Sequence, residues 1–162
     1  MRFLVQPTPE ALDRARPPVR VFLAFAVLLL VAAAAQRASQ GALSPEGLER
    51  LLEAAPGERL GPLVLWEEVH QGAFLYGFLL LALGSLLVVS PVSPRARGTL
   101  LAVSTGAAMV DLLAPFVPLL APSVPGWAGL RIAAFAVASG ALLVSAAVAW
   151  ATFGRTPRRS DG

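Results

Sequence analysis

The chain has 162 residues, a length that fits a single domain. Hydrophobic residues make up 56% of it and charged residues only 14%, where an average soluble domain has roughly 25% charged residues, so the composition indicates a membrane protein. The absence of cysteine excludes disulfide scaffolds, thiolate metal sites and cysteine nucleophiles. All 13 basic residues are arginines, which lie at predicted helix ends without interleaved aromatic residues, and this pattern argues against nucleic-acid binding.

The N-terminal segment 1–18 carries charges of both signs, and Thr8-Pro9-Glu10 is typical of a helix start. It predicts a short amphipathic helix on the membrane surface that ends before Pro17-Pro18. The first apolar run follows at 19–35. Its alanine-rich end could also be the cleavage site of a signal peptide, but such a leader would be long and partly acidic, which favours a retained helix.

Segment 36–62 is the longest polar stretch of the chain. Ser44-Pro45-Glu46 predicts a helix start, because the hydroxyl can cap free backbone donors and the carboxylate lies near the positive helix end. Leucines follow at helical spacing until Pro56-Gly57 stops the helix. A helix with one apolar stripe should lie on the membrane interface or on the outer end of the bundle; binding a partner protein is the alternative.

Three further apolar runs are expected to form helices at 66–89, 99–120 and 131–151, each close to the roughly 20 residues that cross a hydrocarbon core. Short turns join them, so they should be antiparallel neighbours. The predicted fold class is all-α and integral to the membrane: a four-transmembrane-helix bundle at 19–151 with a short periplasmic amphipathic helix, followed by a basic tail at 152–162.

The arginines predict the orientation of this bundle. Nine of them lie in the N-terminal part, the 90–98 turn and the C-terminal tail, whereas four lie on the other side, where glutamates dilute them. Under the positive-inside rule both termini are therefore cytoplasmic, and we expect a multi-pass protein of the bacterial cytoplasmic (inner) membrane. Trp66 and Trp127 would mark the outer interface and Trp150 the inner one.

The second apolar helix has a face that is polar at its start and rich in small residues further along. This face carries Glu67, His70, Gln71, Phe74, Gly77 and Gly84, with Ser85 beside it. These residues share a side because positions three and four apart are neighbours on a helix. Small residues allow another helix to approach closely, so we expect this face to pack inside the bundle.

Asp111 is the most informative single residue, because a carboxylate inside an apolar run costs at least a few kcal/mol unless it is paired, hydrated or protonated. By helical rise it is level with Gly77. Pro115 cannot donate a hydrogen bond to its carbonyl, so the helix should loosen there and form a hydrated pocket that opens outward. Two roles stay open: an ionised partner, with Arg131 the leading candidate, or a proton- or ligand-binding group. Arg131 is also expected near Glu67 and Glu68, where an Arg–Glu pair would tie two helices together.

No catalytic constellation is present in the sequence, so we expect a protein that is not an enzyme. Glu67 and Glu68 are adjacent and would point about 100° apart on a helix, too far to act as a carboxylate pair. His70 is the only histidine, which excludes bis-histidine haem ligation and a multi-histidine metal site within a monomer. We expect His70 to have a hydrogen-bonded structural role, and we predict no cofactor. The alternative is that His70 binds haem or a metal ion, for example in a homodimer.

Glu68, His70, Phe74, Gly77 and Asp111 resemble positions in a set of uncharacterised small bacterial four-helix membrane proteins. In that set the second helix opens with Glu-x-His-x-His-x-Phe-x-x-Gly and the third carries an aspartate. This chain departs from the pattern at Gly72, where the second histidine would stand. The resemblance implies the four-helix topology and supplies no activity.

These features favour a non-catalytic role, as an accessory or structural subunit of a larger membrane assembly, with the lipid bilayer and other membrane subunits or further copies of the chain as partners. The chief alternative is a protein that binds a ligand, proton or metal ion through an outer-leaflet cluster of His70, Asp111, Glu67, Glu68 and Arg131. A small dimeric transporter is a further alternative.

Overall fold

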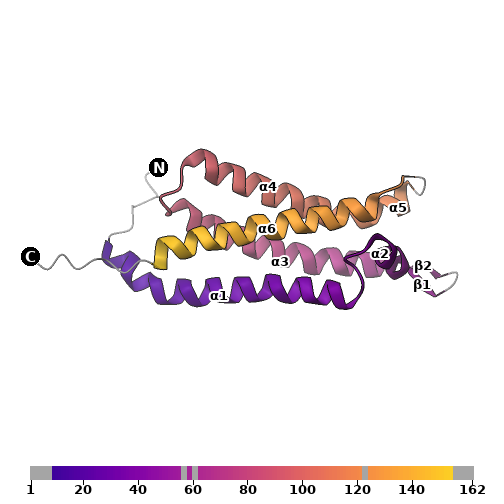
Figure 1. The fold of residues 1–162 in the computed structure, drawn as a ribbon, viewed down its shortest axis with the longest axis horizontal. Helices are drawn as coiled ribbons and strands as arrows, with labels where there is room; N and C mark the ends of the chain where they lie inside the picture. The colour runs from indigo at the N-terminus through magenta and orange to yellow at the C-terminus, as the bar shows by residue number, and fades with distance from the viewer. Residues whose placement is uncertain (1–8, 56–57, 60–61, 122–123, 155–162) are drawn as a thin grey trace, which may run out of the picture.

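The computed structural model describes residues 9–55, 58–59, 62–121 and 124–154 (Figure 1). Its long helices are α1 (Pro9–Ser39), α3 (Pro62–Val88), α4 (Pro94–Leu113) and α6 (Trp127–Gly154). The short elements are α2 (Pro45–Leu52), strands β1 (Glu53–Ala55) and β2 (Glu58–Arg59), the 3-10 turn η1 (Ala114–Phe116) and α5 (Val117–Leu120). Four segments are long and apolar enough to cross a membrane: Arg14–Ser39, Trp66–Val88, Pro94–Leu120 and Trp127–Phe153. The predicted all-α four-helix membrane bundle is thus confirmed.

Helix α6 is the centre of the bundle. It packs most extensively on α4 and also contacts α1 and α3, while α3 and α4 pack on each other, as the short turns predict. Figure 1 shows α1 and α4 on opposite sides of α6. The core is formed by leucines such as Leu23, Leu79 and Leu142, each 1% exposed or less, around the small residues Ala138 and Ala149 of α6. Small side chains on α6 let its neighbours approach closely, which is how helices gain contact energy in lipid.

Helix α1 does not stop at Pro17-Pro18 as expected but runs through both prolines. Proline removes one backbone hydrogen bond, but its fixed φ near −65° is compatible with a helix. The apolar span begins at Arg14, so these prolines lie at the edge of the membrane, where water can solvate the freed carbonyl groups. The expected cap at Thr8, the stop at Pro56-Gly57 and the basic tail after Gly154 lie outside the described residues.

The end of α1 is set by Gly41, whose φ of +73° reverses the chain. The Gly41 amide donates to the Ala38 carbonyl and the Ala42 amide to the Arg37 carbonyl, the pattern of a Schellman cap. Helix α2 follows, and the Ser44 hydroxyl accepts from the Gly47 amide at 3.1 Å, so the predicted cap is confirmed. Leu48 of α2 packs with Ala42, Trp127 and Ala128, which places α2 across the end of the bundle. The hairpin of β1 and β2 was not expected from the sequence.

Helix α4 breaks where Pro115 predicts. The α-helix ends at Leu113 and continues as the 3-10 turn η1 and the short helix α5. Pro115 cannot donate to the carbonyl of Asp111, so one bond of the α-helical ladder is missing at this point. In Figure 1 this break lies at the same end as α2 and the β1–β2 hairpin, while the start of α1, the α3–α4 turn and the end of α6 lie at the other. The irregular parts of the described backbone therefore gather at one end of the molecule.

The glycines of α3 divide between two sides of the helix. Gly84 is buried, and a Cβ built on it would lie 3.2 Å from Cδ2 of Leu101 on α4, so its expected packing role is confirmed. Gly77 is exposed, and a Cβ there would meet no atom within 4 Å, so its expected place at a contact within the bundle is wrong. The buried stripe of α3 includes Tyr76 and Leu79 instead. The Tyr76 hydroxyl needs a partner away from lipid, and this rotates Gly77 outward.

A leucine at each glycine tests this assignment. We expect Gly84→Leu to lower the melting temperature in detergent, because overpacking a filled contact costs about 1–3 kcal/mol. Gly77→Leu is the matched control on the same helix and should leave the melting temperature unchanged. The reverse order of the two effects would show that α3 is rotated differently.

Candidate functional site

Asp111 lies on α4, one turn before the break at Pro115, and is 0% exposed. Arg37 reaches it from the last turns of α1: Nη1 donates to Oδ1 and Nη2 to Oδ2, both at 2.8 Å. This is the bidentate geometry in which guanidinium and carboxylate bind each other most strongly. The pair joins α1 to α4 across the bundle, although the two residues are 74 positions apart.

Two further groups complete the surroundings of Asp111. The Tyr76 hydroxyl of α3 donates to Oδ2 at 2.8 Å, and Nε of Arg131 on α6 lies 3.6 Å from Oδ1. Side chains from all four long helices thus meet at one carboxylate. A buried carboxylate loses its hydrogen bonds to water, and the contacts with Arg37, Tyr76 and Arg131 replace those hydrogen bonds. This arrangement favours the first of the two expected roles of Asp111, that of a partner for charged groups within the bundle.

Arg131 makes a second ion pair, in which Nη2 donates to Oε1 of Glu68 on α3. The expected Arg–Glu link between these two helices is confirmed. The Arg131 side chain is 7% exposed and that of Glu68 is 48% exposed, so this pair lies between the buried cluster and the surface. Nε of Arg131 is sealed from solvent and has no hydrogen-bond partner among the residues that the structure describes.

Arg131 is not the main partner of Asp111, and the sequence-based choice is corrected in favour of Arg37. The guanidinium of Arg37 also lies over the Phe135 ring of α6, 4.0 Å from its centroid, and this cation–π contact fixes the plane in which it meets the carboxylate. Sequence reasoning missed Arg37 because it follows the apolar run, which ended at Ala35. Tyr76 was missed as well, although a tyrosine within an apolar helix is a hydroxyl that must find a partner.

His70 is exposed, and no other group in the described part of the chain hydrogen-bonds to its ring, so the expected hydrogen-bonded structural role is wrong. Glu67 is exposed too and accepts a hydrogen bond from Gln71 at 3.4 Å. Ser85 is exposed and donates to the Leu81 carbonyl of its own helix, so its expected place beside a contact within the bundle is wrong. Of the candidate site residues, the fold brings together Asp111, Arg131 and Glu68, with Glu67 nearby, and leaves His70 on the outer face of α3.

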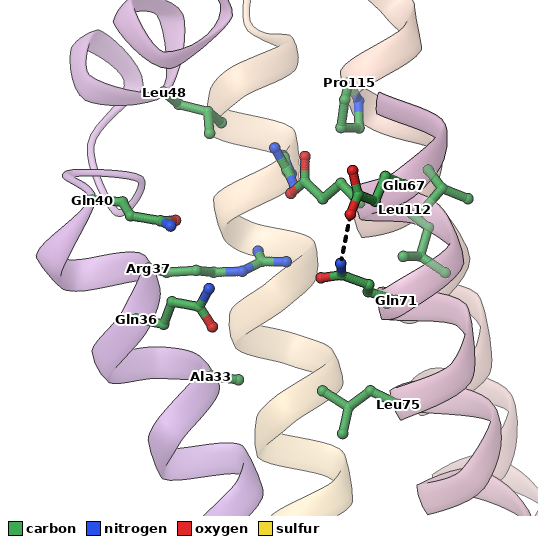
Figure 2. Close-up of a pocket in the computed structure, with 14 residues that line it drawn as sticks. Ala33, Gln36, Arg37, Gln40, Leu48, Glu67, Gln71, Leu75, Leu112 and Pro115 are labelled. Carbon is green, nitrogen blue, oxygen red and sulfur yellow. Dashed lines mark hydrogen bonds and ion pairs between the residues drawn. The ribbon is translucent and has the colours of Figure 1, made fainter. Parts of the chain in front are cut away.

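A cavity of about 490 Å³ lies beside this cluster (Figure 2). Gln36, Arg37 and Gln40 of α1 face Glu67 and Gln71 of α3 across it, as Figure 2 shows. The rest of the lining comprises Ala33, Leu48, Glu68, Val69, Gly72, Leu75, Leu112, Pro115 and Arg131. The expected pocket beside Pro115 is therefore present, but Asp111 lies behind Arg37 and is not part of its wall.

Gly72, in the cavity lining, is also a point of close contact between α3 and α4. A Cβ added to it would overlap Cδ2 of Leu112 on α4, so only glycine lets α3 and α4 approach this closely without moving that side chain. Among the described residues, no group of three or more histidine, cysteine or acidic side chains converges as metal ligands would.

The four apolar helices and the buried charge cluster define an integral membrane protein of the multi-pass class. Residues 58–159 match the family described as a transmembrane helical domain; this range covers more than half of the chain, and the chain belongs to that family. The matched range includes Tyr76, Asp111 and Arg131, whereas Arg37 precedes it. Comparisons with curated proteins and with solved structures give no match.

Proposed function

We propose that this protein is a non-catalytic subunit of a larger membrane assembly and that one exposed face of α3 docks the neighbouring subunit. This docking face consists of His70, Phe74, Gly77, Leu81 and Ser85, which follow one another at spacings of three and four residues. The observation that carries the proposal is that the polar or small residues of this face, His70, Gly77 and Ser85, are exposed although they belong to a membrane-spanning segment.

The composition of the docking face fits a helix from another chain better than it fits lipid. Ionisable side chains within membrane spans almost always face protein or water, and His70 is exposed on the surface of the described chain, where a second helix could cover it. Gly77 offers space, because a Cβ there would meet nothing within 4 Å. Small residues at such positions allow two helices to approach closely, and Phe74, 75% exposed, supplies a large surface to bury. A second copy of the chain or a different subunit could occupy this face.

The charge cluster supports a structural role over a catalytic one. Asp111 is committed to Arg37 and Tyr76 and is sealed from the cavity, so it is poorly placed to exchange a proton with a substrate. Its contacts hold four helices in one arrangement, which is what a scaffold requires. The arginine distribution supports a location in the bacterial inner membrane with both termini in the cytoplasm.

Site-specific photo-crosslinking tests the proposal, and the cysteine-free chain suits it because each introduced cysteine is unique. We expect Phe74→Cys, labelled with a photoreactive maleimide in native membranes, to yield a protein adduct of one defined mass. The control is Phe25→Cys on α1, which is 60% exposed and should yield lipid adducts. Adding Gly77→Leu should abolish the Phe74 adduct, because the added side chain separates the two helices.

The mass of the adduct tells a second copy from a different subunit, and either result supports the proposal. Lipid adducts alone at Phe74, identical to those at Phe25, would contradict it.

A further inference from the structure

The cavity occupies a gap that the packing of α1 leaves open. Helix α1 rests mainly on α6 and contacts α3 through Phe22, whose ring meets that of Phe78 edge-on at 5.9 Å. Nearer the α2 end, the facing side chains of α1 and α3 are Ala33, Gln36, Gln71 and other residues that line the cavity. The space therefore lies between two membrane-spanning helices, with α6 behind it (Figure 2).

Between Gln40 and Leu75 the lining changes from polar to apolar along the helix axes, while the apolar Leu48 and Pro115 line the α2 end beyond this stretch. In Figure 2, Gln40, Arg37 and Gln71 lie toward the α2 end, and Ala33 and Leu75 lie deeper in the bundle. This order matches the polarity of a membrane from its headgroups toward its hydrocarbon. An amphiphilic molecule with its polar group at the α2 end would place that group beside polar residues and its apolar part beside the apolar residues deeper in the bundle.

The lining carries charges of both signs, and one of its arginines, Arg37, is already paired with Asp111 behind it. Two arginines, Arg37 and Arg131, stand with two glutamates, Glu67 and Glu68. A bare anion would lie against the two carboxylates and a bare cation against the two guanidinium groups. A polar group that carries one charge of each sign avoids both conflicts.

Donors and acceptors remain for such a group. Asp111 takes two of the five N–H donors of Arg37, and this side chain is still 21% exposed where it borders the cavity. The remaining donors suit a phosphate, which arginine binds well. Glu67 shares one hydrogen bond with Gln71 in the described part of the chain and keeps further acceptor capacity for an ammonium group.

We propose that the cavity binds the headgroup of a zwitterionic membrane phospholipid, with its phosphate on Arg37 and its ammonium group on Glu67. The acyl chains leave the cavity past Ala33 and Leu75 into the bilayer. A volume of about 490 Å³ lies within the roughly 300–1,000 Å³ typical of ligand pockets. This site is separate from the docking face of α3, so either proposal can fail without the other.

Lipid retention tests the proposal. The full chain is purified in mild detergent, and phosphatidylethanolamine and phosphatidylglycerol are quantified per protein by mass spectrometry. We expect phosphatidylethanolamine to be retained selectively, and Ala33→Phe, which fills the cavity, to reduce its retention about tenfold. The control is Ala32→Phe on the adjacent exposed position of α1, which should retain the lipid as the wild type does.

A second variant keeps the test independent of folding. Glu67 is exposed, so Glu67→Gln should leave the melting temperature unchanged while it removes the preference for the ammonium headgroup. Equal retention in Ala33→Phe and Ala32→Phe, or an unchanged preference in Glu67→Gln, would overturn the proposal. Stabilisation of the lipid-free protein by O-phosphoethanolamine, without any retained phospholipid, would overturn a lipid as the source of the zwitterion.

Discussion

Asp111→Asn is expected to lower the melting temperature of the protein in detergent strongly. The amide would still fit the space, but Arg37 would lose its counter-charge while it stays largely buried. Removing one partner of a buried ion pair costs about 3–5 kcal/mol, because the other charge is left uncompensated. Thermal unfolding of wild type and variant at one pH and one detergent concentration measures the effect.

Glu68→Gln provides the matched control for this substitution. It also turns a paired carboxylate into an amide, but the Glu68 side chain is 48% exposed, and solvent-exposed pairs contribute about 0–1 kcal/mol. We therefore expect a small change at Glu68 and a large one at Asp111. An Asp111→Asn variant as stable as the wild type would mean that the carboxyl is not needed in its charged form, and would favour the alternative in which it binds a proton or ligand.

The two arginines that approach Asp111 are expected to differ strongly. Arg37→Gln removes both short hydrogen bonds to the buried carboxylate and its contact with Phe135, so we expect a loss of about 3–5 kcal/mol. Arg131→Gln leaves that bidentate pair intact and frees Glu68, which water can solvate. A loss of about 1 kcal/mol is expected there.

Melting temperatures of both variants, with the exposed Arg95→Gln as a reference, decide between the two partners. A larger loss for Arg131→Gln than for Arg37→Gln would show that Arg131, the partner expected from the sequence, is the one that neutralises Asp111.

Features encoded by local chemistry could be predicted from the sequence. The lengths of the apolar runs indicate four membrane spans, Ser44 caps α2, and Pro115 ends the regular part of α4. Arg131 and Glu68 were expected to pair because helical rise puts them at the same depth. The depth of a residue in the membrane follows from its position along a helix of known rise, so it can be predicted from the sequence.

Features that depend on helix rotation could not be predicted. Small and polar residues of α3 suggested that His70 and Gly77 face the core, but the hydrogen bond from Tyr76 to Asp111 turns them outward. Arg37 lies beyond the apolar run, and its reach to Asp111 depends on how α1 rests on α6 and on where Gly41 ends the helix. Both outcomes are set by packing between helices, which no local pattern encodes.

A double-mutant cycle between Asp111 and Arg37 tests most directly the claim that their ion pair holds the bundle together. We expect Asp111→Asn combined with Arg37→Gln to be more stable than either single variant, because two neutral side chains leave no buried charge unpaired. Because each single loss is about 3–5 kcal/mol and the double loss is smaller than either, the coupling free energy measured by unfolding should be at least about 3 kcal/mol. A double variant whose loss equals the sum of the two single losses would show that the residues do not interact, and would contradict this account.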